Sequence, residues 1–176
     1  MANSAPDAIA LLKADHRKVE GLFEEFEKAR ASTRKAALVR QICTELTVHT
    51  MIEEEIFYPA CRGKIEGDTL DEAYVEHDGA KMLIAELMDA TPDDAFYDAK
   101  VKVLSEEIKH HVKEEEMRAE GMFAQAREAG LDMAALGAEM RARKEELLAD
   151  FKADGLPVQQ THTMKGAPVE HVGMAS

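Results

Sequence analysis

The sequence contains few of the residues that stabilise small or secreted folds. It has no Trp, only two Cys and five Pro, and aromatic residues make up 5% of its 176 positions. Cys43 and Cys61 fall on what reads as one helix, where a rise of about 1.5 Å per residue separates them by about 27 Å. A disulfide between them is therefore excluded. A chain of this length can bury one apolar core without such a bond.

Long apolar runs and an excess of positive charge are also missing. No stretch reaches the eighteen or so apolar residues that a membrane helix needs, and residues 1–6 lack both the charged and the apolar part of a secretion signal. The formal net charge of −13 disfavours binding to phosphate backbones and anionic membrane surfaces. These absences predict a cytoplasmic protein that binds neither nucleic acid nor membrane. No nucleotide-binding loop, nucleophile elbow or Cys-rich metal motif is present either.

What the sequence does contain is an abundance of helix-forming residues, chiefly Ala, Glu, Lys, Leu and Met. Apolar residues at helical spacing, separated by short breaks, predict an all-α fold with five helices. Their approximate ranges are 7–30, 34–63, 68–91, 93–129 and 131–152. The first four would form an antiparallel up-down four-helix bundle within residues 1–130. Residues 131–154 would be an additional amphipathic helix that packs on the bundle or pairs two copies into a homodimer, followed by a flexible tail over residues 155–176.

Histidine and glutamate interrupt the apolar face of each of the four bundle helices. His49 and Glu53, four residues apart, project from one face of the second helix. A single inward His is more often a hydrogen-bonded core residue than a ligand, but the same anomaly on four helices favours a metal site. Buried charges cost several kcal/mol each against a total stability of about 5–15 kcal/mol, so cations should offset them. The predicted metal ligands are His16, His49, Glu53, His77, His111 and Glu115.

The fourth helix offers two candidate pairs. His110 and Glu114 repeat the spacing found on the second helix, whereas His111 and Glu115 stay in phase with the apolar residue Ile108. We prefer the second pair on this phase argument. Imidazole and carboxylate ligands without a thiolate suit iron or manganese better than zinc, and carboxylates from facing helices can bridge two ions. The expected cofactor is a pair of iron ions.

The pattern His16, His49-x-x-x-Glu53-Glu54, Glu76-His77 and His111-x-x-x-Glu115 resembles the hemerythrin family, specifically its bacterial HHE cation-binding branch. The resemblance covers about residues 7–130 and implies a non-haem di-iron centre in a hemerythrin-like four-helix bundle. Hemerythrins proper carry a His-x-x-x-His pair on the third helix, whereas here the position four after His77 is Lys81. The resemblance therefore implies one ligand fewer and a more open centre.

An open centre favours binding or sensing of oxygen, NO, peroxide or iron over reversible oxygen transport. The alternative is a di-iron enzyme with catalase-like, peroxidase-like or NO-reducing activity in a stress response. A bundle without metal is a third hypothesis, which predicts unchanged stability after chelation. Lys81 either lies near the bound small molecule or extends to the end of the bundle. No catalytic residue is assigned, and His162, His171 and the three Tyr are left out of the site.

Overall fold

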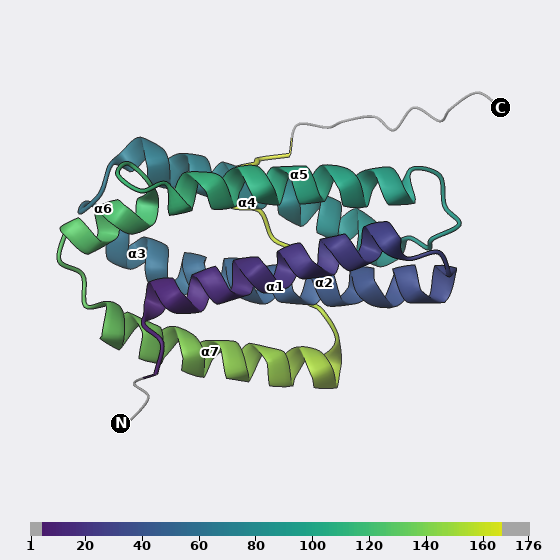
Figure 1. The fold of residues 1–176 in the computed structure, drawn as a ribbon, viewed down its shortest axis with the longest axis horizontal. Coiled ribbons are helices and arrows are strands. Elements are labelled where there is room, and N and C mark those ends of the chain that lie inside the picture. Colours follow the sequence, from purple (N-terminus) through teal and green to yellow (C-terminus); the bar gives the residue numbers. More distant parts are fainter. Residues whose placement is uncertain (1–4, 167–176) are drawn as a thin grey trace.

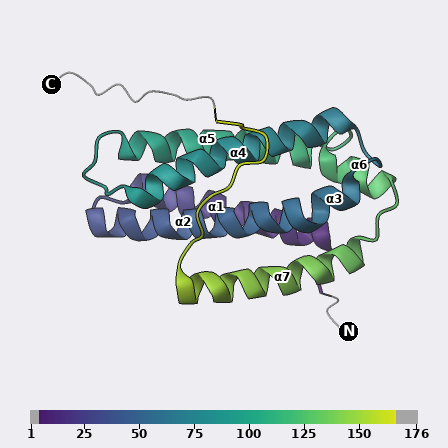
Figure 2. The same ribbon diagram turned by 180° about the vertical axis from the view of Figure 1, so that it is seen from behind.

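The computed structural model describes residues 5–166, which are helical wherever they have regular secondary structure (Figures 1 and 2). The elements are α1 (Ala8–Lys28), α2 (Ser32–Ile52), the π-helix η1 (Glu53–Phe57), α3 (Tyr58–Cys61), α4 (Gly67–Asp89), α5 (Tyr97–Glu116), α6 (Met122–Glu128) and α7 (Met133–Asp154). The all-helical prediction is confirmed for these residues. Residues 1–4 and the last ten residues of the predicted tail, including His171, lie outside the described part.

The long helices lie side by side and run in alternating directions (Figure 1). α1 packs against α2 and α5, and α4 packs against the same two helices. α7 lies along the outer side of α1 and α2 (Figures 1 and 2), so its buried residues Met140 and Leu147 face the bundle. Gly137 makes this packing close, because a Cβ there would lie 2.6 Å from the backbone nitrogen of Ala8. None of the described helices is long and apolar enough to span a membrane.

Two apolar clusters form the core, one toward each end of the bundle. One includes Leu46 and Ile108, and the other includes Leu12 and Phe57. The four inward histidines lie where one cluster gives way to the other; His16, for example, follows Leu12 of one cluster and precedes Val19 of the other. The polar groups are therefore held in the middle of the molecule.

The prediction of one continuous helix over residues 93–129 is wrong at its start and in its interior. The Asp94 carboxylate accepts a hydrogen bond from the backbone N–H of Thr91 at 2.6 Å, and Phe96 adopts a positive φ of 66°, so α5 begins only at Tyr97. α5 then ends at Glu116, and a turn over residues 117–121 leads into α6. The apolar spacing continues across this turn, which is why periodicity alone did not reveal it.

The segment after α7 returns across the bundle. Residues 155–166 form no helix and cross to the side of α4 (Figure 2). There the backbone N–H groups of His162 and Thr163 donate to the buried carboxylate of Asp78 at 2.9 and 2.6 Å. This first part of the predicted tail therefore has defined contacts with α4.

Candidate metal centre

The six predicted ligand residues are all buried and converge in the middle of the bundle. Their ligand atoms form two groups with the spacing of a metal site: one holds His16, His49, Glu53 and Glu115, and the other holds Glu53, His77 and His111. Glu53 belongs to both groups. One carboxylate is therefore shared by the two groups.

In the first group, nitrogen and oxygen atoms face each other at short range. His16 Nε2 lies 3.2 Å from His49 Nε2, which is itself 3.2 Å from Glu53 Oε2. His16 Nε2 also lies 3.3 Å from Glu115 Oε2. These atoms come from α1, α2, η1 and α5, so their convergence depends on the folded bundle.

The second group repeats this arrangement on α4 and α5. His77 Nε2 lies 3.2 Å from His111 Nε2 and 3.3 Å from Glu53 Oε2. His111 Nε2 lies 3.4 Å from Glu115 Oε1. The two oxygens of Glu115 thus face different groups, which makes it a second carboxylate between them.

Each inward histidine has a carboxylate behind its other ring nitrogen. The Nδ1 atoms of His16, His77 and His111 lie within 2.6–2.9 Å of Glu116, Glu54 and Glu76, in that order. Such partners fix the ring and leave Nε2 free to act as a ligand. For His49 the facing carboxylate is that of Asp15, at a longer 3.6 Å from Nδ1.

Sequence reasoning did not assign these four supporting carboxylates, although a signal was present. Each stands directly beside an inward residue in the sequence: Asp15–His16, Glu53–Glu54, Glu76–His77 and Glu115–Glu116. Neighbouring residues point about 100° apart on a helix, so the supporting carboxylate of each pair reaches a histidine on the adjacent helix. Asp15 is also held by the ammonium of Lys144, which links α7 to the site.

Tyr58 is a further residue that sequence reasoning left out. Its hydroxyl lies 3.1 Å from His77 Nε2 and 3.2 Å from Glu115 Oε1, within the second group. The π-helix explains the miss, because five residues along a regular α-helix would place Tyr58 about 140° away from Glu53. The backbone N–H of Tyr58 donates to the Glu53 carbonyl, five residues back, and this wider turn brings both side chains inward.

Lys81 occupies the position where hemerythrins proper have a histidine. It is 5% exposed, and its Nζ donates to both oxygens of Glu54 at 2.8 Å. The alternative in which Lys81 extends to the end of the bundle is therefore wrong. Through Glu54, this ammonium supports His77. His162 also reaches Glu54, with Nε2 3.0 Å from its carboxylate.

The two carboxylates shared by the centre differ in their electrostatics. Burial raises the pKa of Glu53, and the facing carboxylate of Glu115 raises it further. Burial opposes ionisation of Glu115 too, but the positive charges of His111 and His16 lower its pKa overall. Burial also lowers the pKa of His49 to about 4, which keeps its imidazole neutral and able to bind a cation.

Several buried polar atoms in and around the two groups have no hydrogen-bond partner within the described structure. They include Glu53 Oε1, Glu115 Oε2 and Asp15 Oδ2. Buried polar atoms are nearly always satisfied, so carboxylate oxygens without a protein partner beside imidazole nitrogens fit a site that binds a cation. The donor set of nitrogen and oxygen fits iron, manganese or zinc.

The two candidate pairs on α5 differ clearly in burial. His111 and Glu115 face the centre, whereas His110 lies on the surface with 62% of its side chain exposed and Glu114 lies beside it. The preferred pair is therefore the one in the bundle core. Cys43 and Cys61 are both buried and unpaired, as their separation predicts.

A comparison with known families bears directly on this centre. Residues 7–126 match the model of the hemerythrin HHE cation-binding domain. The chain belongs to this family. The matched range contains every residue of the two groups described above.

The chain is also similar to two individual proteins. A crystal structure of an HHE cation-binding domain-containing protein from Mycobacterium kansasii superposes with a TM-score of 0.69 at 22% identity, covering 86% of this chain and 95% of that one. This match shows a hemerythrin-like fold. A protein from Nostoc sp. named DNA nickase is 32% identical over 107 residues, which are 60% of this chain but only 30% of the relative.

Proposed function

We propose that this HHE domain binds two non-haem iron ions and uses them to bind or sense oxygen, NO, peroxide or iron itself. The observation that carries the proposal is the position of Glu53 and Glu115 between two histidine pairs. His16 and His49 would hold one ion, and His77 and His111 the other. When bound, a pair of irons would supply Lewis-acid and redox chemistry.

Side chains around the site would hold the metal ligands in position before a metal binds. Glu116, Glu54 and Glu76 orient three of the four imidazoles, and burial excludes bulk water from their inward nitrogens. Tyr58 places a phenol oxygen among the groups around the second ion. It is therefore a candidate ligand or proton donor at that ion.

A second candidate function is catalytic. Lys81 replaces a histidine, so the second group has two imidazoles and leaves coordination positions for a reactant. An open position beside a buried phenol suits peroxide disproportionation or NO reduction in a stress response, with Tyr58 able to hold or donate a proton. Sustained peroxide or NO consumption would favour this function over stable binding.

The finer features of the architecture belong to the same proposal. We regard α1, α2 with η1 and α3, α4 and α5 as an up-down four-helix bundle, and α7 as an additional helix that supports Asp15. A homodimer formed through α7 would have to use its outward side, since Met140 and Leu147 already face α1 and α2.

The proposal is tested by anaerobic purification, metal analysis and optical spectra before and after exposure to air and to peroxide. We expect about two irons per chain in the parent protein. The variants His49→Ala and Glu115→Ala should lose most of this iron, because each removes a ligand from one or both groups.

The control change is Glu139→Ala, which removes an exposed carboxylate outside the two groups. This variant should retain the iron of the parent. A parent protein that contains no metal after loading, with variants of unchanged stability, would leave only a helical bundle. A stable oxygen or NO adduct supports the binding function, and rapid consumption of peroxide supports the enzyme.

A further inference from the structure

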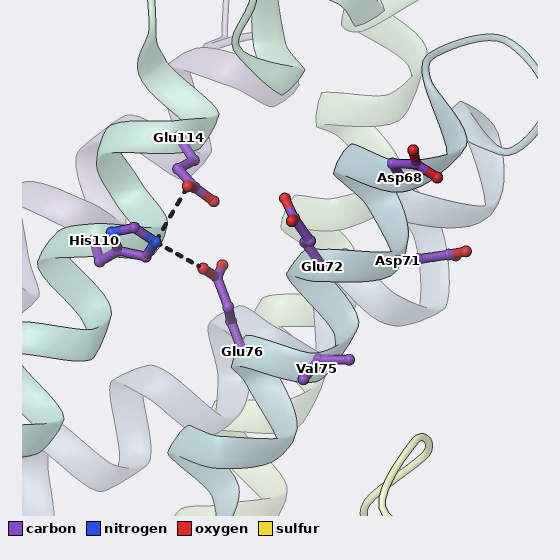
Figure 3. A pocket seen from close by; sticks show the side chains of 7 residues that line it. All are labelled: Asp68, Asp71, Glu72, Val75, Glu76, His110 and Glu114. Atoms are coloured by element: carbon purple, nitrogen blue, oxygen red, sulfur yellow. Dashed lines mark ion pairs between the residues drawn. The ribbon is translucent and has the colours of Figure 1, made fainter.

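A third group of metal-ligating side chains lies on the surface, outside the two buried groups. His110 and Glu114 are one turn apart on α5, and Glu76 faces them from α4 (Figure 3). His110 Nε2 lies 3.1 Å from Glu114 Oε1 and 3.4 Å from Glu76 Oε1. Three ligand atoms from two helices therefore converge on one exposed point.

The pocket beside this group is lined mainly by acidic side chains. The group borders this surface pocket of about 500 Å³, whose seven lining residues include five carboxylates and neither Lys nor Arg. Glu72 points toward the same space, whereas Asp71 points away from it (Figure 3) and pairs with Arg62. A cation in this space would meet one imidazole and at least two carboxylates.

Glu76 is held in position by the buried centre. Its Oε2 accepts a hydrogen bond from His111 Nδ1 at 2.6 Å, and its Oε1 faces His110. The carboxylate therefore cannot swing into solvent without losing a buried hydrogen bond. A surface ion pair between mobile side chains has no such anchor, so this geometry is suited to a ligand site.

We propose that Glu76, His110 and Glu114 form an exposed site for one divalent first-row transition-metal ion, separate from the buried pair. The mixed ligand set fits Mn²⁺, Fe²⁺ or Zn²⁺ better than Mg²⁺ or Ca²⁺, because those two prefer oxygen ligands alone. Open coordination positions and exposure make the site rapidly exchanging.

The shared carboxylate gives this outer site a role in loading the inner one. Glu76 touches both His110 and His111, so an ion held outside is one side chain away from the buried second group. Ferrous ion would collect at the outer site before it enters the bundle. This role, unlike the site itself, rests on the proposed function.

The site is tested by titrating iron-loaded protein, freed of loosely held metal, with Mn²⁺ while electron paramagnetic resonance reports free Mn²⁺. We expect one additional Mn²⁺ per chain in the parent. His110→Ala and Glu114→Gln should each weaken this ion at least about tenfold, since each removes a ligand. Glu139→Gln removes the same charge from exposed α7 and should leave the binding unchanged.

Mn²⁺ binding that is equal in the parent and in His110→Ala, or no additional binding in the parent, would overturn the site. All three substitutions are at surface positions, and equal melting temperatures will show that each chain is folded. The measured quantity is the difference in bound Mn²⁺ between the parent and His110→Ala. This difference does not depend on how much iron fills the buried groups.

The loading role is tested by the rate of ferrous iron uptake. His110→Ala should take up iron more slowly and reach the same final iron per chain as the parent. An unchanged rate would overturn the loading role. If no chain retains iron at all, the proposed di-iron function fails, while the Mn²⁺ titration still decides whether the outer site exists.

Discussion

At the scale of single residues, the centre depends on side chains that act in pairs across helices. His16 of α1 is held by Glu116 at the end of α5, and His77 of α4 is held by Glu54 of η1. A helix that shifted along its neighbour would lose both a ligand and the partner that orients another ligand. The ligand geometry is therefore tied to the packing of the bundle.

Tyr58→Phe tests the residue that the π-helix turns inward. We expect the variant to fold, because the ring that packs against Phe57, Tyr74 and His77 is kept. The loss of the hydroxyl removes an oxygen that lies 3.1 Å from His77 Nε2 of the second group, so bound iron should fall from about two toward about one per chain. Metal analysis together with the visible spectrum of the oxidised protein measures this change.

Tyr74→Phe is the matched control, because Tyr74 contacts the ring of Tyr58 but belongs to neither buried group. It should keep the iron content and spectrum of the parent. If Tyr58→Phe also keeps both irons with unchanged spectra, the phenol has only a packing role.

At the scale of elements, helical phase accounts for what could be predicted from the sequence. The inward positions of His16, His49 and His77 follow directly from the apolar residues on either side of them. Phase along one helix does not give the distance to another, so the supporting carboxylates and the approach of Glu76 to His110 and Glu114 emerged only from the structure. Tyr58 was missed because η1 changes the phase within a continuous helical segment.

The break between α5 and α6 depends on a glycine that periodicity could not interpret. A Cβ at Gly121 would lie 2.5 Å from the carbonyl oxygen of Met117 and 2.7 Å from that of Glu115. The turn that ends α5 therefore needs the absence of a side chain. Because Glu115 faces both buried groups, this turn also positions the centre.

Gly121→Ala should lower the free energy of unfolding by about 1–3 kcal/mol, since the added methyl group must displace backbone. Denaturant unfolding of the metal-free protein measures this without interference from ligand binding. Gly21→Ala is the contrasting control, because nothing lies within 4 Å of a Cβ at that exposed position in α1. It should raise stability by about 0.4–1 kcal/mol. Equal effects at both positions would show that the close approach at Gly121 is not limiting.

At the scale of the whole molecule, α7 and residues 155–166 both contact side chains that support the metal centre. α7 reaches Asp15 through Lys144, and residues 155–166 reach Glu54 through His162. The spacing of apolar residues predicted an amphipathic helix here, and the apolar side of α7 does pack on α1 and α2. Nothing in the periodicity indicated the contacts of residues 155–166, because they are made by backbone N–H groups and a polar side chain.

The net charge of −13 supports a prediction about nucleic acid that the similarity to a DNA nickase makes worth testing. Binding to duplex DNA requires basic side chains that neutralise phosphates and release counterions, and this chain has 22 Lys and Arg against 35 Asp and Glu. We expect the metal-loaded protein neither to retard duplex DNA at about 0.15 M salt nor to nick supercoiled plasmid. Gel electrophoresis measures both, with the same amount of free iron as a control for radical cleavage. Nicking above that control, lost in His49→Ala, would show that the matched 107 residues carry this activity and that the charge argument is wrong.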